Sequence, residues 1–358
     1  MKIDDKTSHN SPSIRFPEFT GEWEKCKIED ITDAVSSGKS KNHFSNGEYN
    51  LYGSTGIIGR TDKALYDGKL VLVARVGANA GFLQIINEPC GITDNTLILK
   101  PKGIDAFYLY YFLQHFNLNR LIFGSGQPLI TGGMLKKVKV SLGTISEQSK
   151  IVKFLSLLDE RIAVQSRLIE DLKKLMCAVS NKLFQSVKGV VIPLSSISNI
   201  VKGKQINGDF LAEVGEYYVM NGGTEPSGYY DNYNVEANTI SISEGGNSCG
   251  YVQFNRMPFW SGGHCYTIQD IVSDVETLYL YHYLKSKEDS IMKLRIGTGL
   301  PNIQKKDLAE FKVIIPAIEQ QRTISNILSL LERKNEIEGQ LLIAMRTEKQ
   351  HLLRQMFI

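Results

Sequence analysis

The sequence repeats itself, and this repeat limits the folds that the chain can adopt. Residues 70–84 align with residues 239–253 at a constant offset of 169, and each segment reads as a strand, a glycine turn and a second strand. Further matches follow in the same order: 108–113 with 279–284, 124–128 with 297–301, and 147–148 with 320–321. Chance similarity would not keep this order over so long a span. The chain is therefore predicted to be a pseudo-twofold internal repeat of one unit.

Each copy is predicted to contain a β-rich globular domain followed by a long helix. Short β-rich runs alternate with Gly, Asn and Pro turns, and one amphipathic helix is expected after Ile104 and after Val275. The predicted fold class is α+β. The predicted boundaries are a flexible N-terminal tail (1–13), a first globular domain (14–145), a central long helix (146–188), a second globular domain (189–317) and a distal long helix (318–358).

Both long helices carry apolar residues at alternating steps of four and three, the seam of helices that pack lengthwise. The predicted seam residues are Ile151, Leu155, Leu158, Ile162, Ile169 and Leu172 in the central helix and Ile324, Leu328, Leu331, Leu342 and Leu352 in the distal helix. A helix cannot bury such a seam alone, so antiparallel pairing is predicted, over roughly 55 to 60 Å at ~1.5 Å per residue. Gln165, Asn335 and Glu338 interrupt the seam and are interpreted either as a polar layer that fixes the register or as a solvated kink.

Composition and charge narrow the class of protein. Hydrophobic residues make up 42% and charged residues 22%, which excludes disordered and collagen-like chains. No apolar run approaches the ~18 residues of a membrane span, and residues 1–13 lack a secretory core, so a cytoplasmic protein without a membrane partner is expected. The net charge of +3 is uneven: residues 14–135 carry 0, residues 136–188 carry +6, and residues 189–317 carry −4. Neither globular part therefore carries the excess of positive charge that a tight nucleic-acid binder would need on its own.

Enzymatic motifs are incomplete. The segment Ser36–Ser40 resembles the end of a phosphate-binding loop around Lys39, but Asp33 stands where that loop needs its first glycine. No methyltransferase tetrapeptide, metal-ligand cluster or CxxC pair is present in the sequence. No catalytic and no metal-binding residue is predicted. A nucleotide hydrolase that uses Lys39, or a coiled-coil scaffold without a DNA role, is the alternative interpretation.

Polar glycine-rich loops are candidate DNA-reading elements, because their donors and acceptors suit base edges and phosphates. The candidate DNA-binding residues are Lys39, Lys41, Asn42, Arg75, Asn79, Ser125, Gln127, Lys202, Lys204, Gln205, Asn221, Asn247, Ser248, Thr298, Asn302 and Lys305. The repeat places Arg75 opposite Glu244, and Gln127 opposite Leu300. A shared scaffold with different loop chemistry suits two domains that read different sequences.

These features resemble the specificity (S) subunits of type I restriction-modification systems over essentially the whole chain. The resemblance rests on Ile14-Arg-Phe-Pro-Glu-Phe-x-Gly-x-Trp23, the Gly-Ser-Gly-Gln-Pro loop at 124–128, the helix starts at 147–148 and 320–321, and the duplicated order of domain and helix. It implies two target-recognition domains, each reading one half of a bipartite double-stranded DNA site, and two antiparallel helices that set the spacer.

The resemblance also implies partners. Two methyltransferase (modification) subunits are expected to dock on the helices, and two restriction (motor-nuclease) subunits are expected to join them. The partner subunits would carry the adenine methyltransferase and ATP-dependent endonuclease activities and would use S-adenosylmethionine, ATP and Mg. This chain is then expected to be a non-catalytic subunit without a cofactor of its own.

Overall fold

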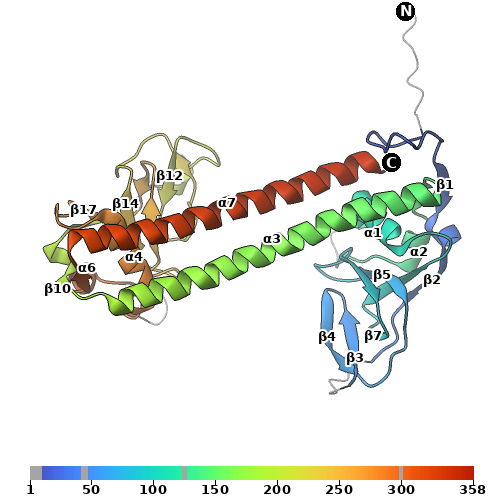
Figure 1. Cartoon of the computed structure of the whole chain (residues 1–358), viewed down its shortest axis with the longest axis horizontal. Coiled ribbons are helices and arrows are strands. Elements are labelled where there is room, and N and C mark those ends of the chain that lie inside the picture. Colours follow the sequence, from blue (N-terminus) through green and yellow to red (C-terminus); the bar gives the residue numbers. More distant parts are fainter. Residues whose placement is uncertain (1–9, 42–46, 123–126, 298–300) are drawn as a thin grey trace, which may run out of the picture. The chain divides into compact units, whose positions relative to one another are not determined.

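The computed structural model describes residues 10–41, 47–122, 127–297 and 301–358. The chain divides into two compact units, each considered by itself below (Figure 1). Unit 1 consists of Met1–Ser166 and Gln340–Ile358, and unit 2 consists of Arg167–Gly339. Each unit therefore combines one β-rich domain with parts of two long helices.

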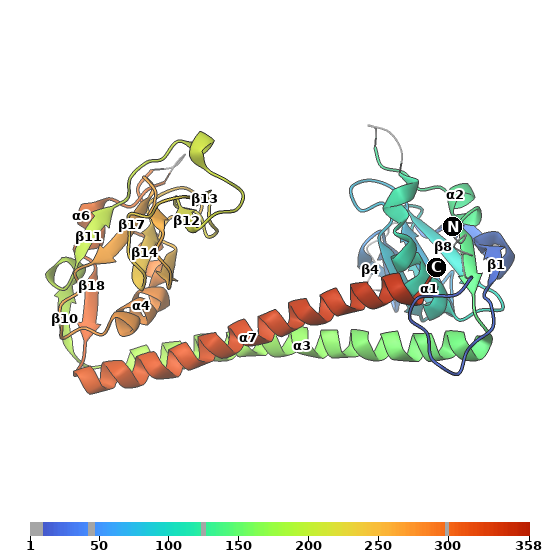
Figure 2. The same ribbon diagram turned by 90° about the horizontal axis from the view of Figure 1, so that it is seen from above.

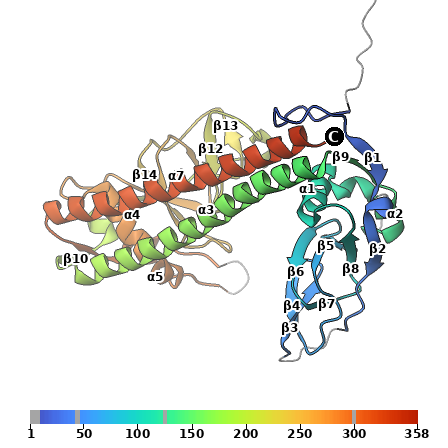
Figure 3. The ribbon, with the colours of Figure 1, turned by 45° about the vertical axis from the view of Figure 1, so that its right-hand side comes forward.

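The main sheet of unit 1 is antiparallel and has the strand order β2-β8-β5-β6. Its strands are β2 (Thr32–Ser37), β8 (Thr96–Pro101), β5 (Lys69–Ala74) and β6 (Leu83–Asn87). Helix α1 (Ala106–Phe116) packs against the sheet beside β5 and β6 (Figure 3). Val71 and Val73 of β5 enter the core that contains α1, while Leu70 and Leu72 enter a second cluster on the opposite face. This alternation is the period-two pattern of a strand that is buried on both faces.

Smaller elements complete unit 1. Strands β4, β3 and β7 form a three-stranded sheet, and β1 pairs with β9. The remaining bounds are β1 (Glu24–Lys27), η1 (Ile28–Ile31), β3 (Tyr49–Gly53), β4 (Gly56–Thr61), β7 (Cys90–Ile92), η2 (Leu118–Leu121), α2 (Gly132–Lys136) and β9 (Lys139–Leu142).

Unit 2 repeats this arrangement (Figure 2). Its main sheet has the order β11-β17-β14-β15 and packs against α4 through β15, and the small sheets are β13-β12-β16 and β10-β18. The bounds are β10 (Val190–Pro193), η3 (Leu194–Ser196), β11 (Asn199–Lys202), η4 (Gly208–Phe210), β12 (Tyr217–Met220), β13 (Tyr229–Tyr230), β14 (Thr239–Ser243), β15 (Val252–Asn255), β16 (Trp260–Ser261), β17 (Cys265–Gln269), α4 (Thr277–Ser286), α5 (Glu288–Met292), α6 (Lys305–Ala309) and β18 (Lys312–Ile315). The matching strand orders confirm the predicted internal repeat.

The two long helices are α3 (Ile145–Ser186) and α7 (Ile318–Met356). Helix α3 begins one residue before the predicted start, and the Thr144 hydroxyl accepts a hydrogen bond from the Glu147 amide at 3.3 Å, which caps the first turn. All predicted seam residues are buried or half-buried, and so are Gln165, Asn335 and Glu338. Helix α3 continues without interruption through Gln165, so the structure contains no break at that layer of the described helix.

In each unit the start of one long helix lies beside the end of the other. In unit 1, Ile151 and Leu155 share a core with Leu353 and Met356. In unit 2, Phe184 at the end of α3 shares a core with residues at the start of α7, Ile324 and Leu328 among them. The pairing is therefore antiparallel, and the predicted fold class is confirmed.

The end of α7 occupies in unit 1 the place that the end of α3 occupies in unit 2. The ring of Phe357 lies 5.3 Å from that of Tyr108, and the ring of Phe184 lies 5.9 Å from that of Tyr279. The first segment of the chain closes over the same region, because the Ile14 amide donates to the Gln355 carbonyl at 3.0 Å. Each domain thus packs against the start of one long helix and the end of the other.

Candidate nucleic-acid and partner interfaces

A tight loop follows the central strand β5 in unit 1 and β14 in unit 2. In unit 1 the Gly81 amide donates to the Ala74 carbonyl at 2.9 Å, and in unit 2 the Gly250 amide donates to the Ser243 carbonyl at 2.8 Å. The loops also need glycine at equivalent positions, because Gly77 has φ of 79° and Gly246 has φ of 74°. The two loops are the same turn built twice.

The residue at the start of this loop joins three segments of the chain. In unit 1 the Arg75 amide donates to the Asn95 carbonyl at 2.9 Å, and the Arg75 carbonyl accepts from the Ile130 amide at 2.8 Å. In unit 2 the corresponding bonds connect Glu244 with the His264 carbonyl and the Ile303 amide, at 2.9 and 2.8 Å. We call this shared arrangement the loop junction. Its backbone is conserved between the units while its side chains differ.

Unit 2 carries a charged network at the loop junction. Glu244 is buried, and its carboxylate accepts from Lys202 Nζ at 2.6 Å and from the Tyr266 hydroxyl at 3.0 Å. His264 Nδ1 lies 3.8 Å from the same carboxylate. Burial, together with the hydrogen bond to Glu244, raises the pKa of Tyr266, so this phenol stays a donor. Because the Lys202 side chain is 52% exposed, Glu244 holds one outward-facing donor in place, and the His264 side chain, 63% exposed, lies beside it.

Unit 1 presents a different side chain at the same position. Arg75 is half-buried, and its Nε is buried without a hydrogen-bond partner among the described residues. The strand register aligns Ser37 with Lys202, because Ser37 pairs with Leu97 and Lys202 pairs with Tyr266. A single guanidinium therefore replaces the lysine and carboxylate pair of unit 2. A guanidinium offers five donors in a rigid fork, and a lysine offers three on a flexible stem.

A basic groove of about 360 Å³ lies near the loop junction of unit 1. Lys39, Lys41 and Lys63 line it, with Asp62 as the one acidic residue among its lining side chains. The groove lies close to the junction because the Gly38 amide donates to the Thr96 carbonyl at 3.0 Å, one residue beyond Asn95. Clustered lysines on a groove wall suit phosphate oxygens.

Close packing against a neighbouring strand explains why position 38 of the Gly-Lys-Ser segment is a glycine. A Cβ on Gly38 would lie 2.3 Å from the carbonyl oxygens of Ile92 and Thr93, and Gly203 in unit 2 is crowded in the same way by Gly262. Residues 38–41 follow strand β2, and none of these described residues starts a helix. A phosphate-binding loop requires a helix at this point, so the geometry gives the nucleotide hydrolase alternative no support.

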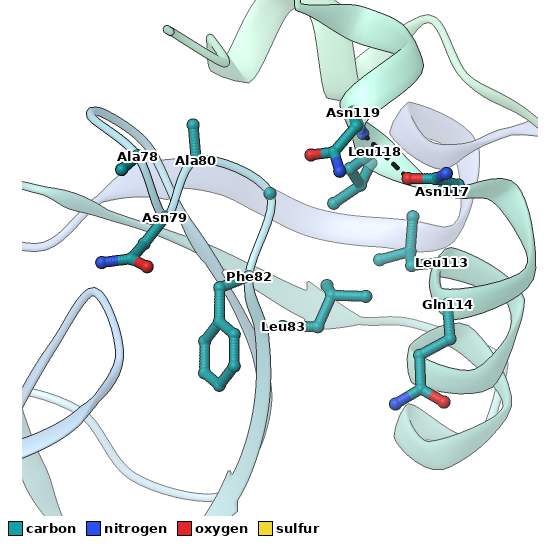
Figure 4. Close-up of a pocket in the computed structure, with 11 residues that line it drawn as sticks. Ala78, Asn79, Ala80, Phe82, Leu83, Leu113, Gln114, Asn117, Leu118 and Asn119 are labelled. Carbon is teal, nitrogen blue, oxygen red and sulfur yellow. Dashed lines mark hydrogen bonds between the residues drawn. The ribbon is translucent and has the colours of Figure 1, made fainter. Parts of the chain in front are cut away.

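A shallow pocket of about 300 Å³ lies beside the same loop of unit 1 (Figure 4). Asn79 and Phe82 border it on the loop side, and Gln114, Asn117 and Asn119 border it on the side of α1 and η2. Phe82 is 48% exposed, which is high for an aromatic ring. Exposed amides beside an exposed ring can hydrogen-bond and stack on nucleotides. Of these residues, only Asn79 is among the sequence candidates.

The structure brings most sequence candidates to these loops, and all described candidates are exposed or half-buried. In unit 2, Asn302 forms a β-bridge with Gly245, and the Asn221 side chain accepts from the His264 amide at 3.3 Å. The other described candidates of unit 2 are Lys204, Gln205, Asn247, Ser248 and Lys305, and those of unit 1 beyond the groove are Arg75, Asn79 and Gln127. Asn42, Ser125 and Thr298 lie outside the described residues.

A second surface runs along the long helices. Several large apolar side chains point to solvent in steps of three, four and seven, which places them on one face of each helix. On α3 they are Phe154, Leu157, Val164, Leu168 and Leu175, and on α7 they are Ile327, Leu330, Ile337 and Leu341. We call each set an outer stripe. The first four residues of the α3 stripe match the α7 stripe at a constant offset of 173, so the two stripes are copies of one surface.

Comparison with known proteins identifies the family. The family model of the type I restriction modification DNA specificity domain matches residues 20–174 and again residues 187–345. The chain belongs to this family. Two matches in tandem agree with the internal repeat, and the protein is a type I restriction-modification DNA specificity subunit with two target-recognition domains.

Two relatives of this specificity subunit match most and about half of its length. A protein of Mycoplasma genitalium named as a type I specificity subunit is 25% identical over 359 residues, covering 94% of each chain. One of Mycoplasma pneumoniae is 31% identical over 166 residues, which is 46% of this chain and 44% of the relative. The crystal structure of a type I S subunit from M. genitalium has a TM-score of 0.72 at 23% identity and covers 97% of this chain and 99% of that one, a likeness of fold.

Within the described ranges, no helix is long and apolar enough to cross a membrane. The same ranges contain no group of three or more His, Cys, Asp or Glu side chains that could hold a metal ion.

Sequence reasoning missed His264, Tyr266, Asn95 and the outer stripes. The repeat offset of 169 between Asn95 and His264 was the available signal for that pair.

Proposed function

We propose that each target-recognition domain reads one half of a bipartite DNA site and that the chain supplies recognition without catalysis. The observation that carries this proposal is the loop junction, whose backbone is the same in both units and whose side chains differ. A common scaffold gives both domains the same approach to DNA. Different side chains give each half-site its own base preference.

The side chains suggest how each domain reads its half. The Arg75 fork matches the O6 and N7 acceptors of guanine in the major groove. In unit 2, Lys202 is the donor that Glu244 holds in place, and His264 is exposed beside it. The lysines of the basic groove contact phosphates and set the position of the duplex. Since the second globular domain carries a net −4, partner subunits supply part of the charge that neutralises DNA.

We further propose that each outer stripe docks one methyltransferase subunit. Two copies of one apolar surface suit two identical partners, since exposed apolar stripes of this kind mark interaction sites. Two motor-nuclease subunits would join them, and these partners would use S-adenosylmethionine, ATP and Mg, with adenine methylation and DNA cleavage as their activities. Helix α3 has 42 residues and hence a length of about 63 Å, which exceeds one DNA turn of ~34 Å and suits a spacer.

The recognition proposal is tested by mapping methylated positions in DNA from cells that carry the chain with its methyltransferase partner. Arg75→Ala should relax the preference at one base pair of one half-site, since a bidentate contact contributes about 1–3 kcal/mol of discrimination. Lys202→Ala should affect the other half-site. Lys25→Ala and Lys312→Ala remove exposed lysines of small two-stranded sheets and serve as controls. An unchanged methylation pattern in both loop variants, or changes confined to the same half-site, would contradict the proposal.

The docking proposal is tested by the mass of the assembled complex. Leu157→Glu and Leu330→Glu should each weaken one docking surface roughly tenfold or more, because a buried leucine contributes about 1.5–3 kcal/mol. Each single variant should then retain one methyltransferase subunit and the double variant none. Ala163→Glu places the same carboxylate on another exposed face of α3 and should retain both. Full assembly by the double variant would refute this docking surface.

A further inference from the structure

The two units differ at one site beside the paired helices. In unit 1, Lys349 of α7 reaches Asp159 of α3, with Nζ 2.5 Å from a carboxylate oxygen. The same ammonium lies 5.4 Å from the centre of the Tyr111 ring, and the Tyr111 hydroxyl donates to Asp159 at 2.9 Å. Only 14% of the lysine side chain is exposed. Unit 1 therefore contains an internal, largely buried ammonium that connects α1, α3 and α7.

Unit 2 has the same site without the ammonium. At the offset of 173, Asp159 corresponds to Glu332 and Lys349 corresponds to Met176. His282 takes the place of Tyr111, and its Nε2 lies 3.0 Å from the Ser329 hydroxyl, as the Tyr111 hydroxyl lies 3.2 Å from Ser156. The carboxylate of Glu332 is kept and accepts from the Tyr281 hydroxyl at 3.0 Å. The cation is replaced by a thioether.

A cavity of about 520 Å³ lies at this position in unit 2. Met176 and Leu328 line it with apolar atoms, and Glu332 and His282 line it with polar ones. The side chain of Glu332 is only 21% exposed. The cavity therefore joins an apolar wall to a largely buried carboxylate, the combination that the lysine stem and ammonium satisfy in unit 1.

Among the described residues of unit 2, no lysine or arginine forms an ion pair with Glu332, whose pKa is raised by burial; Arg256 and Lys285 are close enough to act on its charge but pair with Glu336 and Glu288. Burial lowers the pKa of His282 to about 4, so the imidazole is uncharged. Lys285 borders the cavity, but its ammonium binds Glu288 at 2.6 Å and the Val252 carbonyl at 2.9 Å. Lys173 also lines the cavity and is exposed, and it forms no ion pair with Glu332 within the described part of unit 2.

We propose that this cavity is a binding site for a primary alkylammonium ion. The alkyl chain lies along Met176 and Leu328, and the ammonium donates to Glu332. The ligand thereby supplies to unit 2 the contact that Lys349 supplies within unit 1, connecting α3, α4 and α7. This site is separate from the loop junctions and from the outer stripes, so it adds a ligand to a recognition subunit whose proposed function does not require one.

The test uses the full-length chain and n-butylammonium chloride, which has the carbon chain and ammonium of a lysine side chain. Calorimetric titration should detect binding to the wild type that n-butanol does not reproduce. Met176→Lys should fill the site from within, raise the melting temperature without ligand and abolish binding. Glu332→Gln should weaken binding roughly tenfold or more, because a charge-assisted hydrogen bond is lost. Met176→Leu is the matched control and should keep the affinity.

The repeat supplies a gain-of-function variant. Lys349→Met opens the equivalent site in unit 1 and should create a second butylammonium site, while lowering stability in the absence of ligand. The proposal is overturned if the wild type does not bind butylammonium, or if Met176→Lys and Glu332→Gln bind it as tightly as the wild type. If Met176→Lys does not fold, the comparison of butylammonium affinity between Glu332→Gln and Met176→Leu decides the test.

Discussion

The ion pair between Arg15 and Glu147 offers a quantitative test of how the first segment of the chain is fixed to α3. Arg15 donates through Nε and Nη2 to the two carboxylate oxygens of Glu147, at 2.6 and 2.8 Å. The Glu147 side chain is 0% exposed and that of Arg15 is 14% exposed. The hydrogen bond to Glu147 raises the pKa of Arg15, so its guanidinium stays charged.

The expected magnitudes follow from burial. Arg15→Met leaves a fully buried carboxylate without its cation, and such a change costs about 3–5 kcal/mol of the free energy of unfolding. Glu147→Met leaves a largely buried guanidinium and should cost a similar amount. The double variant replaces both charges by apolar groups and should lie within about 2 kcal/mol of the wild type, because a buried pair gains little over a well-packed apolar contact.

Tryptophan fluorescence in urea can report on unit 1 alone. The chain has two tryptophans, Trp23 in unit 1 and Trp260 in unit 2. In a Trp260→Phe background the signal comes from Trp23, which is 1% exposed in the same core as Leu155 and Phe357. The reasoning is refuted if the single variants each cost less than about 1 kcal/mol, or if the double variant loses the sum of both, since either result removes the coupling between the charges.

Two further predictions concern the cores. Phe357→Ala and Phe184→Ala should each cost about 3–5 kcal/mol in their own unit only, seen as faster amide hydrogen exchange there, and a loss shared by both units would contradict their equivalence. The pKa of His282 is lowered to about 4 by burial. Below pH 6.5 the imidazole of His282 binds a proton in the unfolded chain but stays neutral in the folded chain. Unit 2 should therefore lose up to about 3 kcal/mol of stability as pH falls from 6.5 towards 4. His282→Gln should remove most of this loss in urea titrations at pH 7 and 4.5, and an unchanged pH dependence would contradict the assignment.

The sequence predicts best the features that leave a regular pattern along the chain. The seam at Ile151, Leu155 and Leu328 follows from spacing along one helix, and the internal repeat follows from ordered matches. The strand predicted at the start of the repeated segment 70–84 is confirmed as β5. The seam and the strand depend on neighbours a few residues apart, and the repeat depends only on the order of matched segments, so none of these signals requires knowledge of the strand order.

The site could be predicted only in part because its chemistry depends on strand order. Arg75 meets Asn95, and Glu244 meets His264, only because β5 pairs with β8 and β14 pairs with β17. The role of Gly38 likewise depends on the backbone at Ile92, which lies far away in the sequence. The outer stripes were missed because exposed and buried apolar residues look alike in a periodic helix, and only burial separates Leu157 from Leu155.

The exchange of helix ends between the two copies has a consequence for how recognition can evolve. Each domain packs against the start of one long helix and the end of the other. The packing residues correspond at a constant offset, with Phe184 matching Phe357 and Ile151 matching Ile324. A domain of this fold placed between these helix ends would therefore pack against equivalent residues in either unit. If each domain reads one half-site, as proposed, then replacing one domain should change the preference at one half-site and leave the other half-site unchanged.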